Sequence, residues 1–212
     1  AFEPLYDFVR KHRRLFDDYE AFQQVGVLFT QSQQGAGSKY YMPLKHVCAG
    51  LVNANIPFGI AVAGDELLAN RLTGYEADRF DVMLIPEPIR LIDGQAEIVK
   101  GWQAEGIAIA TKPGDDVAVK IAGRIQPLVS LESNSRVWLF PRAIPGKTDA
   151  PWVCHVVNAA YDAKRNQAVK QENVVVSFVD SLWNGRPPGE VTYHAIGQPP
   201  RVLPLAHTRD RL

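Results

Sequence analysis

Short apolar runs that alternate with stretches of helical spacing constrain this chain most. Residues 25–30 read Val-Gly-Val-Leu-Phe-Thr, a run that is too short for a helix and that leads into a polar, glycine-containing loop. Such a run is typical of a fully buried parallel strand. A helical pattern and a second apolar run follow it, up to residue 65. Residues 25–65 therefore predict a strand, a loop, a helix and a strand, with the helix packed across the sheet.

The same alternation continues to residue 111. Proline, glycine and asparagine interrupt it where the elements should end. The further elements that we expect are, in order, a helix over 43–54, a strand over 58–63, a short helix over 66–72 capped by Asp65, a central strand over 81–86, a helix capped by Asp93 and ended by Gly106, and a strand over 107–111. Strands that alternate with helices of this length predict an α/β fold with a doubly wound parallel sheet.

The pattern changes near residue 123, after which we find no good helix. Four short strand candidates separated by turn residues follow, over 135–140, 152–158, 173–179 and 190–195. They predict a small antiparallel β-sandwich domain. The expected division of the chain is a lead-in helix over 1–22, an α/β domain over 23–123 and a β-sandwich over 124–212.

Composition excludes several classes of partner. The 23 basic and 23 acidic residues balance, so no overall charge attracts nucleic acid. The densest basic cluster, residues 10–14, lies opposite an apolar helix face and reads as a solvated surface. No apolar run approaches the ~20 residues that cross a bilayer, so we expect no membrane contact.

The chain starts without Met, which indicates a processed product or a piece of a longer polypeptide.

The candidate binding residues follow the predicted strands, because ligands of open α/β sheets bind beyond the carboxyl ends of the strands. They are Thr30, Gln31, Ser32, Gly35, Gly37, Asp65, Glu87 and Lys112. The loop around Gly35 and Gly37 could hold a phosphate or contact a neighbouring subunit, but it lacks the third glycine of the dinucleotide motif and the Lys-Ser/Thr of the P-loop. Asp65 and Glu87 would form an acid and nucleophile pair if they met; otherwise they are a helix cap and a loop residue.

No complete catalytic group is visible. A class I amidotransferase needs a cysteine on a sharp strand-to-helix turn, whereas Cys48 falls inside an apolar helix face and Cys154 inside a strand. These two cysteines permit one disulfide at most and leave the compartment open. The five histidines are scattered without the spacing of metal ligands. We therefore expect no catalytic residue, no metal and no cofactor.

The order of parts nevertheless resembles a known family. The residues that carry the resemblance are Phe8 to Phe16, the helix end at 53–57, Tyr75 with 80–86, the run Trp-Val-Cys-His-Val-Val-Asn at 152–158, Tyr161, Asp162 and 173–176. In these segments the chain is similar to the C-terminal half of bacterial β-galactosidase-like glycoside hydrolases. That half carries a class I glutamine amidotransferase-like, flavodoxin-like trimerisation domain and then a β-sandwich.

The resemblance implies a role without catalysis. The catalytic carboxylates of that family lie on a barrel that this sequence does not contain, so no catalytic residue carries over. The expected function is a structural or oligomerisation module of a carbohydrate-active protein, with copies of itself and a carbohydrate as partners. The alternative is a small-molecule-binding or degenerate amidotransferase-like domain that uses the crevice at the strand ends. The apolar residues Leu5, Phe8, Leu15 and Phe16 must fold back onto the chain or pair with a second copy, which predicts a symmetric dimer.

Overall fold

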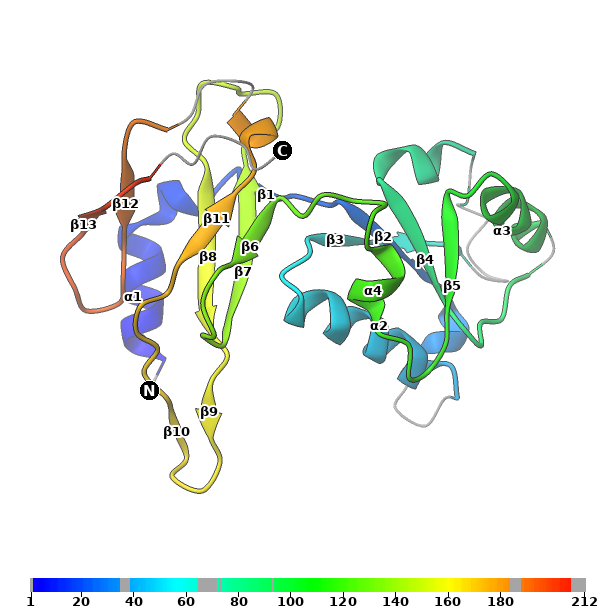
Figure 1. Cartoon of the computed structure of the whole chain (residues 1–212), viewed down its shortest axis with the longest axis horizontal. Coiled ribbons are helices and arrows are strands. Elements are labelled where there is room, and N and C mark those ends of the chain that lie inside the picture. Colours follow the sequence, from blue (N-terminus) through cyan, green and yellow to red (C-terminus); the bar gives the residue numbers. More distant parts are fainter. Residues whose placement is uncertain are drawn as a thin grey trace.

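The computed structural model describes residues 2–34, 39–64, 72, 74–92, 94–183 and 188–206 of the 212. Figure 1 shows an α/β part built around a parallel sheet and, beside it, a β-rich part that also holds both chain ends. Within the described ranges, no helix is long and apolar enough to cross a membrane.

The α/β part is the parallel sheet that the sequence predicts. Its strands are β2 (Val25–Phe29), β3 (Phe58–Val62), β4 (Val82–Pro86) and β5 (Ala108–Thr111), in the order β3-β2-β4-β5. The helices around it are α2 (Tyr41–Asn53), α3 (Gln95–Ala104) and α4 (Val117–Ile121), with the 3-10 turns η2 (Gln31–Gln33) and η3 (Gly74–Arg79). All three strand pairs are parallel, so the α/β prediction is confirmed, while the likeness to an amidotransferase stays a prediction.

Both faces of the sheet are covered, which explains why β2 and β4 are apolar without alternation. Val25, Val27 and Leu84 pack into one cluster with side chains of α2 and α4. Leu28 and Met83 point to the other face, into a cluster with Trp102 of α3 and with residues of η3. The sheet is therefore the middle layer of three.

Two glycines lie side by side on the edge strand β3 and its neighbour β2. Gly26 of β2 is paired in register with Gly59 of β3, and the ring of Phe80 covers both positions. A Cβ built on Gly26 would lie 2.6 Å from that ring and one on Gly59 would lie 3.0 Å from it. Glycine is therefore required here by the close approach of the phenyl ring.

The β-rich part consists of short antiparallel sheets. Its strands are β1 (Glu20–Ala21), β6 (Val129–Leu131), β7 (Val137–Ala143), β8 (Val153–Asn158), β9 (Tyr161–Asp162), β10 (Gln167–Ala168), β11 (Val176–Phe178), β12 (Val191–Tyr193) and β13 (Arg201–Leu203). The 3-10 turn η4 (Asp180–Trp183) lies between β11 and β12. The pairings are β1-β7-β8, β6-β11, β9-β10 and β12-β13. The four expected strands correspond to β7, β8, β11 and β12; the sandwich arrangement stays a prediction.

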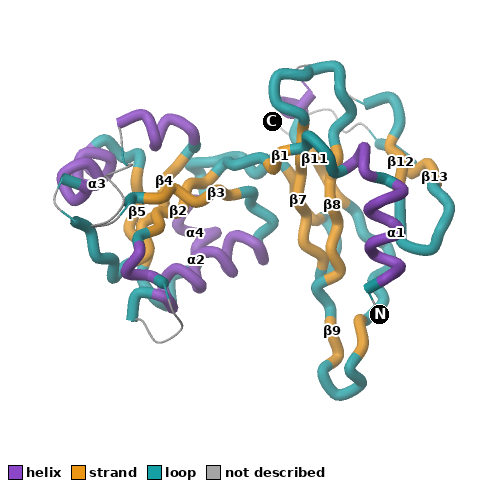
Figure 2. Tube along the Cα trace, turned by 180° about the vertical axis from the view of Figure 1, so that it is seen from behind, coloured by secondary structure: helices purple, strands orange, loops and turns teal. Residues whose placement is uncertain are grey.

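The segment before β2 belongs with this β-rich part. The helix α1 (Glu3–Lys11) is shorter than the expected lead-in helix over 1–22, because the backbone leaves helical geometry at His12 and continues as the 3-10 turn η1 (Arg13–Leu15). Glu20 and Ala21 then pair with β7. Figure 2 shows α1 alongside β8, and the ring of Phe16 lies 4.7 Å from that of His155.

One helix of the α/β part was not predicted from the sequence, and the cap of another differs from the expected one. The helix α4 was not expected, because its five residues are mostly β-branched; the side chain of Asp116 caps it by accepting a hydrogen bond from the Val119 N–H at 3.2 Å. The N-cap of α3 is Gly94, with a positive φ of 81°. The caps proposed at Asp65 and Asp93 and the helix over 66–71 lie outside the described residues.

Candidate functional site

The carboxyl ends of the strands open where the strand order reverses. The pairing of β2 with β4 stops at Val27 and Leu84, whereas β2 stays paired with β3 up to Phe29 and Val62. The two central strands therefore separate toward their carboxyl ends. This is the point at which open α/β sheets bind ligands.

Two buried glutamines hold the loops at this edge. The Gln33 Oε1 accepts a hydrogen bond from the Thr30 N–H at 2.7 Å, and the Gln95 Oε1 accepts one from the Ile92 N–H at 3.1 Å. Gln95 Nε2 also donates to the Ala63 carbonyl at 2.5 Å. Both side chains are fully buried. The polar groups described here therefore serve the chain's own backbone first.

The sequence-predicted residues fall into two groups at this edge. Thr30 and Ser32 lie together after β2, with their hydroxyl oxygens 2.6 Å apart, and Gln31 beside them is exposed. Glu87 and Lys112 follow neighbouring strands, because the Glu87 N–H donates to the Thr111 carbonyl at 2.7 Å.

Lys112 is exposed, and its N–H donates to the carboxylate of Asp115 at 2.7 Å. That bond is the first cause, ahead of Lys120, that lowers the pKa of Asp115. Gly35, Gly37 and Asp65 lie outside the described residues. Ligand binding by any of these residues stays a prediction.

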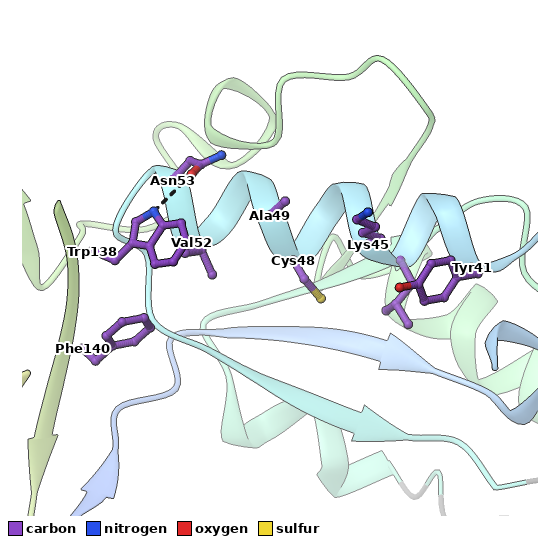
Figure 3. A pocket seen from close by; sticks show the side chains of 9 residues that line it. Tyr41, Lys45, Cys48, Ala49, Val52, Asn53, Trp138 and Phe140 are labelled. Atoms are coloured by element: carbon purple, nitrogen blue, oxygen red, sulfur yellow. Dashed lines mark hydrogen bonds between the residues drawn. The ribbon is translucent and has the colours of Figure 1, made fainter. Parts of the chain in front are cut away.

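A second candidate site is a groove of about 540 Å³ between α2 and β7. Figure 3 shows the rings of Trp138 and Phe140 at one end, Tyr41 at the other, and the sulfur of Cys48 between them. The remaining lining residues are Leu44, Lys45, Ala49, Val52 and Asn53. The groove thus combines aromatic and aliphatic walls with an ammonium, an amide and a phenol group.

Two asparagines at the end of α2 fix the aromatic wall. The Trp138 Nε1–H donates to Asn53 Oδ1 at 3.2 Å, which leaves the amide N–H groups of Asn53 as donors at the groove. The buried Asn55 has a φ of 57°, a left-handed geometry that asparagine tolerates at a helix end, and its Oδ1 accepts from the Leu139 N–H at 2.8 Å. Sequence reasoning missed this groove, because no local pattern joins Trp138 to Asn53.

Neither cysteine is set up as a nucleophile. Burial raises the pKa of the Cys48 thiol, and it raises that of Cys154 to about 11. A thiol of this kind stays protonated at neutral pH and reacts slowly. Both cysteines are free, so no disulfide joins them. Among the described residues, no group of three or more His, Cys, Asp or Glu side chains could hold a metal ion.

The comparison with known proteins gives one similarity. An alpha-agarase of Thalassotalea agarivorans is 27% identical to this chain over 174 residues. The match covers 76% of this chain but 11% of the agarase, so the chain spans about a tenth of that relative's length. No family model matches the chain, and no solved structure does.

Proposed function

We propose that this chain is a non-catalytic module of a carbohydrate-active protein and that it contacts a saccharide in the groove between α2 and β7. The observation that carries the proposal is the aromatic wall of Trp138 and Phe140 beside the amide of Asn53. The similarity to a protein named for its action on agar, a polysaccharide, supports the ligand class.

The groove offers what a sugar ring needs for recognition. One face of a pyranose presents C–H groups that pack on an aromatic ring, and its hydroxyl groups accept and donate hydrogen bonds at the rim. Phe140 is 36% exposed, so its ring is open to such a contact. The Asn53 amide and the exposed Lys45 ammonium supply donors at the rim. Apolar walls with a few polar groups are typical of small-molecule sites.

The described residues support the lack of catalysis. The two thiols are protonated, and at the sheet edge backbone groups engage the Gln95 amide and the Gln33 Oε1. The charged candidates there are Glu87 and Lys112, which follow neighbouring strands. A carboxylate and an ammonium without an activated nucleophile do not amount to an acyl-transfer or glycosidase site.

A binding assay tests the saccharide contact. We expect isothermal titration with agar oligosaccharides to give measurable affinity, and Phe140→Ala to weaken it by about tenfold, which corresponds to ~1.4 kcal/mol. Phe140 is partly exposed, so the variant should keep its fold. The matched control is Tyr161→Ala, which removes an exposed ring of β9 outside the groove and should bind like the original chain. Equal affinity for both variants, or none for the unmodified chain, would rule the groove out.

A turnover assay tests the other half of the proposal. Incubation with agar and with chromogenic glycosides should release no product. Release that disappears in Glu87→Gln or Asp65→Asn would instead make the strand-end crevice an active site, which is the alternative function. A thermal-shift screen with nucleotides and glutamine distinguishes simple binding there, because a ligand at a hundredfold excess over its Kd adds about 2.7 kcal/mol of stability.

We also propose self-association through the outer face of α1. Phe8, Leu15 and Phe16 are partly covered within the chain, whereas Phe2, Leu5 and Tyr6 are 72%, 44% and 68% exposed. Light scattering at micromolar concentration should give the mass of a dimer, and Leu5→Asp should give that of a monomer. Val119→Asp, at a 70% exposed valine of α4, is the control. A monomeric mass for the unmodified chain would contradict this proposal.

A further inference from the structure

Three of the five histidines gather where α1 meets the β-rich part. His12 ends α1, His155 lies on β8 and His194 follows β12. The rings of His12 and His194 meet edge to face, with centroids 4.8 Å apart. His155 faces Phe16 at 4.7 Å, and its Nε2–H donates to the Leu15 carbonyl at 3.4 Å. Figure 2 shows α1 between β8 and β12.

The charges that act on the His12 and His155 rings are positive. His12 is next to Lys11 and Arg14 on its own segment and faces His194 across the contact. His155 faces Arg142 of β7. Asp17, on the segment that follows His12, pairs with Arg13 at 2.7 Å on the exposed side. A positive charge on the His12 ring would therefore be repelled by Lys11 and Arg14.

The buried nitrogen of His194 adds to this effect. Its Nδ1 is buried and has no hydrogen-bond partner. The contact therefore holds a buried polar atom that is not satisfied, so it has no spare hydrogen bond to offset a charge added at His12.

We propose that acidification releases α1 from the β-rich part, with protonation of His12 in its ring contact with His194 driving the release. The His12 ring then becomes charged in a contact that favours its neutral form, and the helix separates. Release uncovers the rings of Phe8 and Phe16, which lie in an edge-to-face contact 6.3 Å apart. Acid would thus convert a closed segment into one with an open apolar face.

The direction of the pH dependence follows from the pKa shifts. Burial first, and then His194, lower the pKa of His12 below its ordinary value of 6.5. Burial likewise lowers the pKa of His155, although its bond to the Leu15 carbonyl opposes the shift. The detached segment therefore binds more protons than the docked one below that value. The neutral His12 ring therefore supports docking above pH 6.5, and docking weakens as the pH falls below that value.

Hydrogen exchange of the whole chain tests the release. We expect the amides of residues 3–16, after correction for intrinsic rates, to exchange about tenfold faster at pH ~5 than at pH ~7.5. The amides of β2 and β4 should keep their protection. The protein is held at a concentration where light scattering gives the monomer mass, so that self-association does not protect α1.

Two variants separate the histidine pair from general acid sensitivity. His12→Phe combined with His194→Phe keeps the ring contact without a charge, and α1 should then stay protected at pH ~5. His46→Gln removes a histidine of α2 whose ring contacts the Asp115 carbonyl instead, and it should release α1 like the original chain. The protection of β2 and β4 shows that each variant is folded. Equal protection of α1 at both pH values in the original chain, or release in the double phenylalanine variant, would overturn the proposal.

Discussion

Replacing Gly26 by alanine is expected to destabilise the chain by about 2–3 kcal/mol. The added Cβ would lie 2.1 Å from the sulfur of Met83 and 2.6 Å from the ring of Phe80. Both side chains are buried in the same cluster, so neither can move without displacing others. Urea denaturation should show a lower midpoint with an unchanged slope.

Gly101→Ala is the matched control for this variant. Gly101 lies inside α3, and a Cβ there meets nothing within 4 Å. We expect a gain of about 0.5–1 kcal/mol, because alanine has the higher helix propensity. Adding Met83→Val to Gly26→Ala should recover part of the loss, since the two sites share one space. Losses that simply add, or a Gly26→Ala variant as stable as Gly101→Ala, would contradict the steric explanation.

Replacing Gln24 by alanine is expected to cost about 1–3 kcal/mol. This buried side chain joins the α/β part to the β-rich part: its Nε2 donates to the Gln126 carbonyl at 2.8 Å and its Oε1 accepts from the Leu128 N–H at 3.0 Å. The variant leaves both backbone groups without this partner. Chemical denaturation gives the loss, and hydrogen exchange should show it first in β6, directly after Leu128.

Gln103→Ala is the control for the second variant. Gln103 is exposed on α3, and its replacement should change stability by less than about 0.5 kcal/mol. Gln24→Glu keeps an acceptor for the Leu128 N–H, but it brings a second carboxylate to Asp81, whose Oδ2 lies 3.4 Å from Gln24 Nε2. Its stability should therefore rise on protonation at low pH. Three variants of equal stability would mean that the Gln24 bonds contribute nothing.

The parallel sheet could be predicted because its signal is local. Residues 25–29 and 82–86 are apolar without alternation, which follows from being buried on both faces. The short helix α4 could not, since its valines favour strands and only the Asp116 cap and packing on α2 make it helical. Strand β1 was missed for a related reason: two residues carry no periodicity.

The residues of the candidate sites could likewise be predicted only in part. Thr30, Ser32, Glu87 and Lys112 follow strands, so topology alone brings them to one edge. The groove depends on Trp138 meeting Asn53 across 85 residues, and no local pattern encodes that contact. The glutamines Gln33 and Gln95 read as ordinary loop and helix residues, because a side chain that folds back to a backbone N–H three residues earlier leaves no hydrophobic pattern. The sequence pattern shows neither the long-range contact of Trp138 with Asn53 nor these local glutamine bonds.

The placement of β1 beside β7 has a consequence for the order of folding during synthesis. The hydroxyl of Tyr19 donates to the Pro151 carbonyl 132 residues later, so the partner emerges on the order of ten seconds after Tyr19 at a rate of about 5–20 residues per second. The whole parallel sheet is translated in that interval and can close over its own core. Until then the segment with Phe8 and Phe16 stays exposed to water, because the surface on which it docks has not yet been synthesised. A chaperone that binds apolar helices, or early contact with a second nascent chain, would act in this window.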